Sequence, residues 1–205
     1  INEIIENGFD SPRGARAIAR MNSLHARFRI ANEDFLYVLS TFVFEPIRWN
    51  ERFGWRRMSE SEKLAWFWFW RQLGERMQIR DIPETMPEFE SYGRAYETAN
   101  FRFTQANQRV ALATRELFAG WFPALLRPLV RRSIHALLDP PLLAAFGLPA
   151  APRWLIWTAE HALRLRAGAL RCLPKRRRPK LRTQIPRSDY PHGYRIESLG
   201  PPPAD

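Results

Sequence analysis

The 205-residue sequence predicts an all-α protein: a single helical bundle followed by an extended basic tail. Apolar residues recur at intervals of three and four, as they do on one face of a helix. Two capping boxes, at residues 59–62 and 85–88, mark helix starts. No segment alternates polar and apolar residues for long enough to build a sheet. The core of such a bundle is able to host a cofactor.

The first two helices are predicted from their caps and apolar faces. A cap at residues 10–11 should begin a helix that runs to about Ile30. Asn32 should cap the next helix, whose middle, residues 35–44, is apolar on nearly every face and is therefore expected to be buried. Pro46 should kink or end this helix, because proline lacks a backbone N–H.

The remaining helices follow from similar signals. The capping box at 59–62 opens a helix with five consecutive aromatic residues, 66–70. Further helices are expected at residues 85–101, 105–120, 124–138 and 152–173. Residues 1–173 are thus predicted to form one helical domain. Residues 174–205 are rich in arginine, lysine and proline, so they should form a tail that is extended or docks onto the domain.

The composition is that of a globular protein with many aromatic rings. The apolar fraction is 45%, with eight tryptophans and fourteen phenylalanines, so rings are expected in the core or against lipid or a hydrophobic ligand. The single cysteine, Cys172, excludes an internal disulfide and a cysteine-based metal cluster. No apolar run is long enough to span a bilayer.

The net charge of +11 is concentrated in two groups. The denser group comprises Lys175, Arg176, Arg177 and Arg178, and the second comprises Arg127, Arg131 and Arg132. An anionic membrane surface and plain solvation both explain the denser group. Nucleic acid is not favoured, because no stacking aromatics alternate with the basic residues. The proline-interrupted apolar stretch 117–149 indicates an interfacial hairpin, a hydrophobic channel or an ordinary helix pair.

His25 lies on an apolar helix face that it shares with Ile18, Met21 and Phe28. Its imidazole is either a hydrogen-bonded core histidine or a ligand to a metal or haem iron in an apolar pocket. Spacing alone favours the first interpretation. His161 is the next candidate ligand, and the remaining histidines are His135 and His192. The sequence has no His-x-x-x-His or Glu-x-x-His pair, so zinc and di-iron sites lack support.

The residues around His25 favour the second interpretation. From Asn22 to Arg56 the sequence reads NSLHARFRIANEDFLYVLSTFVFEPIRWNERFGWR. This stretch resembles the fungal ER-bound oxygenases of the MpaB type, related to mycophenolic-acid biosynthesis, which share a catalytic domain with the latex-clearing rubber oxygenases. Later matches extend the resemblance over most of the chain, at Glu62-Lys63, Phe69-Trp70-Arg71, Gly74, Met77, Ile79, Asp81-Ile82-Pro83, Tyr96-Glu97, Tyr190, Gly193-Tyr194 and Leu199-Gly200-Pro201.

The resemblance implies a haem-dependent oxygenase that uses dioxygen to cleave a carbon–carbon double bond in an isoprenoid or other lipophilic substrate. It implies haem b as the cofactor and places His25 at the position of the axial ligand to the haem iron. Asn22, Asp34, Tyr37 and Arg48 are the polar candidates of the same stretch for the pocket or a haem propionate. Helix caps and surface ion pairs are their alternative roles.

The family pattern also places an Arg-x-x-x-Thr pair well before the histidine, on the facing side of the haem. Because the chain begins at Ile1, we expect a fragment that lacks N-terminal helices and can be inactive alone. The parent protein is expected at the endoplasmic reticulum membrane, in secondary metabolism. The competing hypothesis is a non-enzymatic, membrane-peripheral helical interaction module without a cofactor.

Overall fold

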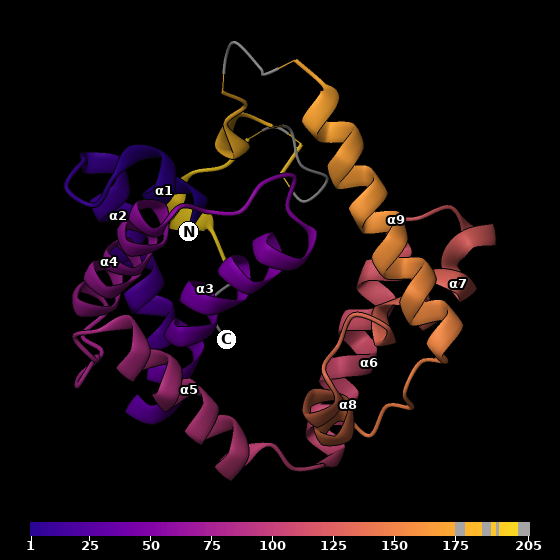
Figure 1. The fold of residues 1–205 in the computed structure, drawn as a ribbon. Helices are drawn as coiled ribbons and strands as arrows, with labels where there is room; N and C mark the ends of the chain where they lie inside the picture. The colour runs from indigo at the N-terminus through magenta and orange to yellow at the C-terminus, as the bar shows by residue number, and fades with distance from the viewer. Residues whose placement is uncertain (175–178, 186–189, 192, 201–205) are drawn as a thin grey trace. The chain divides into compact units, whose positions relative to one another are not determined.

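The computed structural model describes residues 1–174, 179–185, 190–191 and 193–200, and within them the regular elements are all helical (Figure 1). The predicted all-α class is therefore confirmed. In chain order the elements are α1 (Asn2–Asn7), α2 (Pro12–His25), α3 (Asn32–Phe53), α4 (Glu60–Arg76), α5 (Met86–Asn100), α6 (Gln105–Gly120), η1 (Ala124–Leu126), α7 (Arg127–His135), α8 (Pro140–Phe146), α9 (Arg153–Cys172), η2 (Arg182–Gln184) and η3 (Ile196–Ser198). They form two compact units, residues 1–43, 61–86 and 174–205 in the first and residues 44–60 and 87–173 in the second.

The first unit contains α1, α2, the N-terminal part of α3, and α4. Its most deeply buried side chains include Ile4, Leu36, Leu39, Val43, Phe67, Trp70 and Leu73. Helices α3 and α4 approach each other closely at Gly74, where an added Cβ would lie 2.5 Å from a methyl group of Leu39. Any larger residue at this position would force the side chains of Leu39 and Ile82 to move, and the approach brings together two walls of the pocket described below.

Pro46 does not end α3, which continues to Phe53. Because proline has no N–H, the carbonyl of Phe42, four residues earlier, loses its donor within the helix. The indole Nε1 of Trp66 on α4 donates a hydrogen bond to this carbonyl, at 3.1 Å. A tertiary contact thus satisfies the oxygen that the proline leaves free, and the helix continues where its sequence predicted a kink or an end.

The described parts of the tail contact α1. The backbone N–H of Arg182 donates to Glu6 at 2.6 Å, and the hydroxyl of Tyr194 donates to Glu3 at 2.5 Å. The basic group 175–178 lies outside the described residues, so its predicted membrane contact stays a prediction. The predicted domain boundary at residue 173 likewise stays a prediction.

The second unit contains the rest of α3 together with α5 to α9, and α6 packs against both α7 and α8. Phe44 of α3 meets Phe89 of α5 edge to face, with ring centroids 5.9 Å apart. Helix α8 ends at Gly147, whose positive φ of 61° is a left-handed conformation that favours glycine. The residues that line the pocket around His25 all belong to the first unit, so the residues of α3 in the second unit are not among them.

The observed helices differ from the predicted ones in several places. Helix α2 ends at His25 rather than near Ile30, because Arg27 and Phe28 turn back through hydrogen bonds to carbonyls three residues earlier. The pattern predicts neither α1 nor α8, since helices of six and seven residues are too short for a recognisable period. The helix expected at 124–138 is the short η1 followed by α7. No helix in the described ranges is long and apolar enough to cross a membrane.

Candidate functional site

His25 is the last residue of α2, and neighbouring helices fix its ring. Phe35 of α3 contacts the imidazole edge on, with ring centroids 5.2 Å apart. One turn earlier on α2, the amide of Asn22 donates to the carbonyl of Arg76 at the end of α4, at 3.0 Å. Helix α2 is therefore held by both α3 and α4, and tertiary packing sets the orientation of the imidazole.

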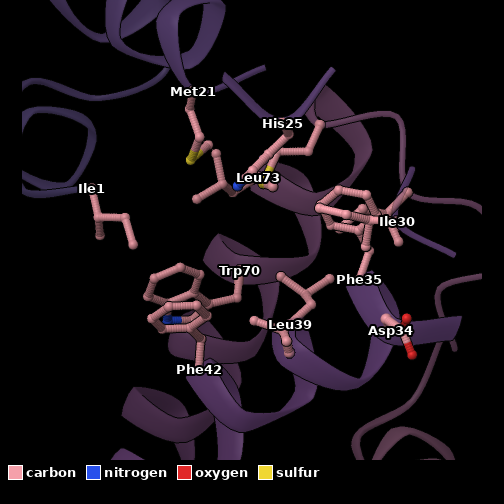
Figure 2. Close-up of a pocket in the computed structure, with 13 residues that line it drawn as sticks. Ile1, Met21, His25, Ile30, Asp34, Phe35, Leu39, Phe42, Trp70 and Leu73 are labelled. Carbon is pink, nitrogen blue, oxygen red and sulfur yellow. The ribbon is translucent and has the colours of Figure 1, made fainter. Parts of the chain in front are cut away.

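The imidazole lines an apolar pocket of about 340 Å³ that lies wholly within the first unit (Figure 2). The lining residues are Ile1, Met21, His25, Ile30, Asp34, Phe35, Val38, Leu39, Phe42, Trp70, Leu73, Met77 and Ile79. Figure 2 shows the rings of Phe42 and Trp70 together, across the pocket from Met21 and His25. These two rings stack with centroids 4.6 Å apart. A pocket with such walls suits a flat or extended apolar molecule.

The two nitrogens of His25 differ in their surroundings. Nδ1 is buried and has no hydrogen-bond partner within the described part of the chain. Nε2 is not among the buried atoms that lack a hydrogen-bond partner in the described residues. Burial lowers the pKa of His25 below its usual 6.5, so the ring is neutral at pH 7. A neutral imidazole with an accessible lone pair is the form that binds metals.

Buried polar atoms without a partner are rare and require an explanation, such as a function or a bound ion. The other described histidines differ at Nδ1: that of His135 lies 3.1 Å from the carbonyl of Pro149, and that of His161 lies 2.7 Å from that of Trp157, although Nε2 of His135 is also buried without a partner. His192 lies outside the described residues. His25 is thus distinguished by an apolar pocket and by the lack of a protein acceptor at Nδ1.

A second hollow, of about 300 Å³, shares His25 with the first, and its lining is partly polar and partly apolar; we call it the polar hollow. Its lining includes Asn32, whose amide accepts from the N–H of Arg80 at 2.9 Å and donates to the carbonyl of Arg80 at 3.1 Å. Gln78 and Asp81 on either side have positive φ angles of 64° and 60°. Asn32 therefore secures a strained turn instead of capping α3, and this turn places Arg80 beside the histidine.

The four other predicted site residues differ in their position relative to the two hollows. Asn22 lines the polar hollow, and Asp34 lies at the edge of the apolar pocket (Figure 2). Tyr37 is half-buried on α3 and is not a lining residue of either hollow. Arg48 belongs to the second unit, where its guanidinium pairs with Glu45 at 2.6 Å and Glu90 at 3.0 Å. A cofactor contact for each of these four residues stays a prediction.

Sequence reasoning missed two residues of the site. Trp70 closes the apolar pocket, but it lies within five consecutive aromatic residues that gave no basis for choosing one. Arg80 reaches the polar hollow only through the turn that Asn32 holds, and no spacing rule links these two positions. In the described ranges no three His, Cys, Asp or Glu side chains are grouped to hold a metal ion.

The fold and the pocket together define an all-α protein, in its described residues, with a histidine in the lining of an apolar cavity. The chain belongs to the family described as "ER-bound oxygenase mpaB/B'/Rubber oxygenase, catalytic domain", whose model matches residues 4–173. The family resemblance predicted from the sequence is therefore confirmed, and the family is one of oxygenases.

Three curated relatives carry names of the same kind. The chain is 26% identical over 171 residues to the ER-bound oxygenase mpaB' of Penicillium brevicompactum and 28% identical over 176 residues to the ER-bound oxygenase mpaB of that organism. These alignments cover 75% and 72% of this chain but only 40% and 44% of the relatives. An ER-bound oxygenase mpaB of Penicillium roqueforti is 29% identical over 113 residues, which is 47% of this chain and 38% of the relative. The chain thus spans about two fifths of the length of the curated relatives that it matches. No solved structure matches it.

Proposed function

We propose that this chain provides the axial-ligand side of a haem-dependent oxygenase, with haem b as the cofactor and His25 as the residue that would bind the haem iron. The observation that carries the proposal is the neutral imidazole that lines an apolar pocket. The residues present fit this cofactor, because a haem needs one axial base and apolar walls around its macrocycle. A metal ion held by protein ligands alone would need more donors than one imidazole.

The chain's own residues have separable roles in this proposal. Phe35 orients the imidazole, while Phe42 and Trp70 exclude water from the far end of the pocket. The positive charge of Arg80 in the polar hollow suits a propionate carboxylate. When bound, the haem supplies the dioxygen chemistry, and the protein supplies orientation and a dry environment.

The substrate class that we propose is a lipophilic molecule with a carbon–carbon double bond, such as an isoprenoid. Dioxygen would cleave this bond, and its two oxygen atoms would end on the two separated carbons as carbonyl oxygens. Support comes from the apolar lining and from membership in an oxygenase family. The names of the relatives support a location at the endoplasmic reticulum membrane, where Lys175–Arg178 would contact anionic lipid.

Titrating haemin into the purified chain tests the cofactor. We expect a Soret band that saturates at equimolar haemin, because the pocket is lined by one imidazole that can bind the iron. The titration is repeated on the longest natural form of the protein, and His161→Ala serves as the control that should bind haemin unchanged. If neither form takes up haemin, the haem proposal is wrong and the cofactor-free interaction module replaces it.

Haemin affinity should also depend on pH in a specific direction. Only the neutral imidazole binds iron, and burial lowers the pKa of His25 below 6.5. Protonation of the free protein therefore begins at a lower pH than for an exposed histidine. We expect the dissociation constant to stay level from pH 8 to about pH 6.5 and to rise only below it. A dissociation constant that already rises between pH 8 and pH 7 would contradict the assignment of His25.

A further inference from the structure

A strongly exposed apolar segment joins α6 to α7 in the second unit (Figure 1). We name residues 117–129, from the end of α6 through η1 into α7, the α6–α7 corner. Leu117, Trp121, Leu125 and Leu129 are exposed by 60%, 66%, 91% and 52%. Contiguous apolar exposure of this kind marks an interaction surface, whereas single exposed apolar side chains are ordinary.

Positive charge accompanies the apolar side chains of the corner. Residues 105–135, which span α6, η1 and α7, contain five arginines and one acidic residue, Glu116, so their formal net charge is +4. Arg131 pairs with Glu116 at 2.7 Å. Arg109, Arg127 and Arg132 are exposed. The surface therefore combines apolar side chains with cationic flanks and little compensating negative charge.

The shape of the corner limits the kind of partner. All residues from Trp121 to Leu129 are exposed, so the segment projects from the unit instead of lining a groove for a peptide. Pro123 and Pro128 interrupt the helical path, and the segment is too short to cross a bilayer. A projecting apolar loop between cationic helices fits the interfacial zone of a membrane, which takes up apolar side chains without a complementary rigid surface.

We propose that the α6–α7 corner docks into the interface of an anionic membrane. Trp121 and Leu125 enter the acyl-chain boundary, and the exposed arginines lie at the anionic headgroups. The inference rests on the proposed membrane association but assigns it to a surface other than the basic group 175–178. It requires no haem. A contact of the basic group would be electrostatic alone, whereas the corner inserts apolar side chains.

Flotation with vesicles of phosphatidylcholine, with and without phosphatidylserine, tests the docking. The double variant Trp121→Ser/Leu125→Ser is expected to bind phosphatidylserine vesicles at least about tenfold more weakly, since two apolar side chains no longer enter the interface. The matched control is Trp154→Ser/Leu165→Ser on α9, whose side chains are 62% and 74% exposed and lie outside the corner. The control should bind like the parent chain.

Quenching by brominated acyl chains gives a second readout that does not depend on a destabilising change. Trp121→Phe should lose most of the quenched tryptophan fluorescence, whereas Trp154→Phe should keep it. Replacing Lys175–Arg178 with glutamine should weaken vesicle binding but leave Trp121 quenched. The proposal is overturned if Trp121 is not quenched or if the double variant binds vesicles like the parent chain. It is also overturned if the corner instead mediates a dimer that Trp121→Ser abolishes. If the variant with glutamine at Lys175–Arg178 loses all vesicle binding, and Trp121 of the parent chain is not quenched, then the tail alone accounts for membrane association.

Discussion

His25→Ala is expected to lower the affinity of the protein for haemin by at least about a hundredfold, because it removes the axial base. The pocket itself should persist, since the ring makes no hydrogen bond that supports the fold within the described residues. The change is therefore expected to lower the free energy of unfolding by no more than about 1 kcal/mol. Haemin titration followed by absorption, together with denaturant unfolding, measures the two effects separately.

Added imidazole should partly restore haemin binding to His25→Ala, because the removed ring leaves room in an apolar cavity for a free base. The matched control is His135→Ala, which deletes another buried histidine in the other unit. His135→Ala should lower stability without changing the Soret band. If His25→Ala binds haemin with the parent's affinity and spectrum, His25 is a core histidine and not the ligand.

Most of the helices could be predicted because their signals are local. The capping boxes at 59–62 and 85–88 lie at the observed starts of α4 and α5, and the range predicted for α6 matches the observed helix. At Pro46 the local sequence signal did not predict the observed structure. The effect of Pro46 on α3 depends on Trp66 of another helix, which donates to the carbonyl that proline leaves free. No pattern within α3 contains that information.

Part of the site could also be predicted from local sequence signals. The apolar stripe and the Asn-x-x-His block indicated His25, and the structure places this residue in the lining of an apolar pocket of the first unit. The stripe also placed Phe28 on the same helix face, but α2 ends at His25 and Phe28 is 64% exposed. Arg80 reaches the site through a turn with positive φ angles that Asn32 holds from a distant position. Such a contact depends on the tertiary fold, so spacing along the chain cannot predict it.

Glu3→Ala is expected to lower the free energy of unfolding by about 2–3 kcal/mol. The Glu3 side chain is only 4% exposed and joins three elements of the first unit. Arg13 of α2 donates two hydrogen bonds to its carboxylate, at 2.5 and 2.9 Å, and Tyr194 of the tail donates a third at 2.5 Å. Removing the carboxylate leaves these donors without their shared acceptor. Arg13 is half-exposed, so water can hydrate its guanidinium once the carboxylate is removed. This hydration limits the loss of stability.

The pH dependence of stability identifies the charge as the cause of that loss. The hydrogen bonds from Arg13, aided by Tyr194, hold the pKa of the Glu3 carboxyl below its usual 4.5 despite burial. The folded state therefore binds this proton less readily than the unfolded state, so the stabilisation is complete above pH 4.5 and disappears as the pH falls through the lowered pKa. The free energies of unfolding of the parent chain and of Glu3→Gln should differ most near pH 7 and should become similar in acid. Tyr194→Phe, which keeps the charge, should lose about 1 kcal/mol at both pH values. An equal loss for Glu3→Gln at pH 7 and in acid would show that shape, rather than charge, holds the tail to α1.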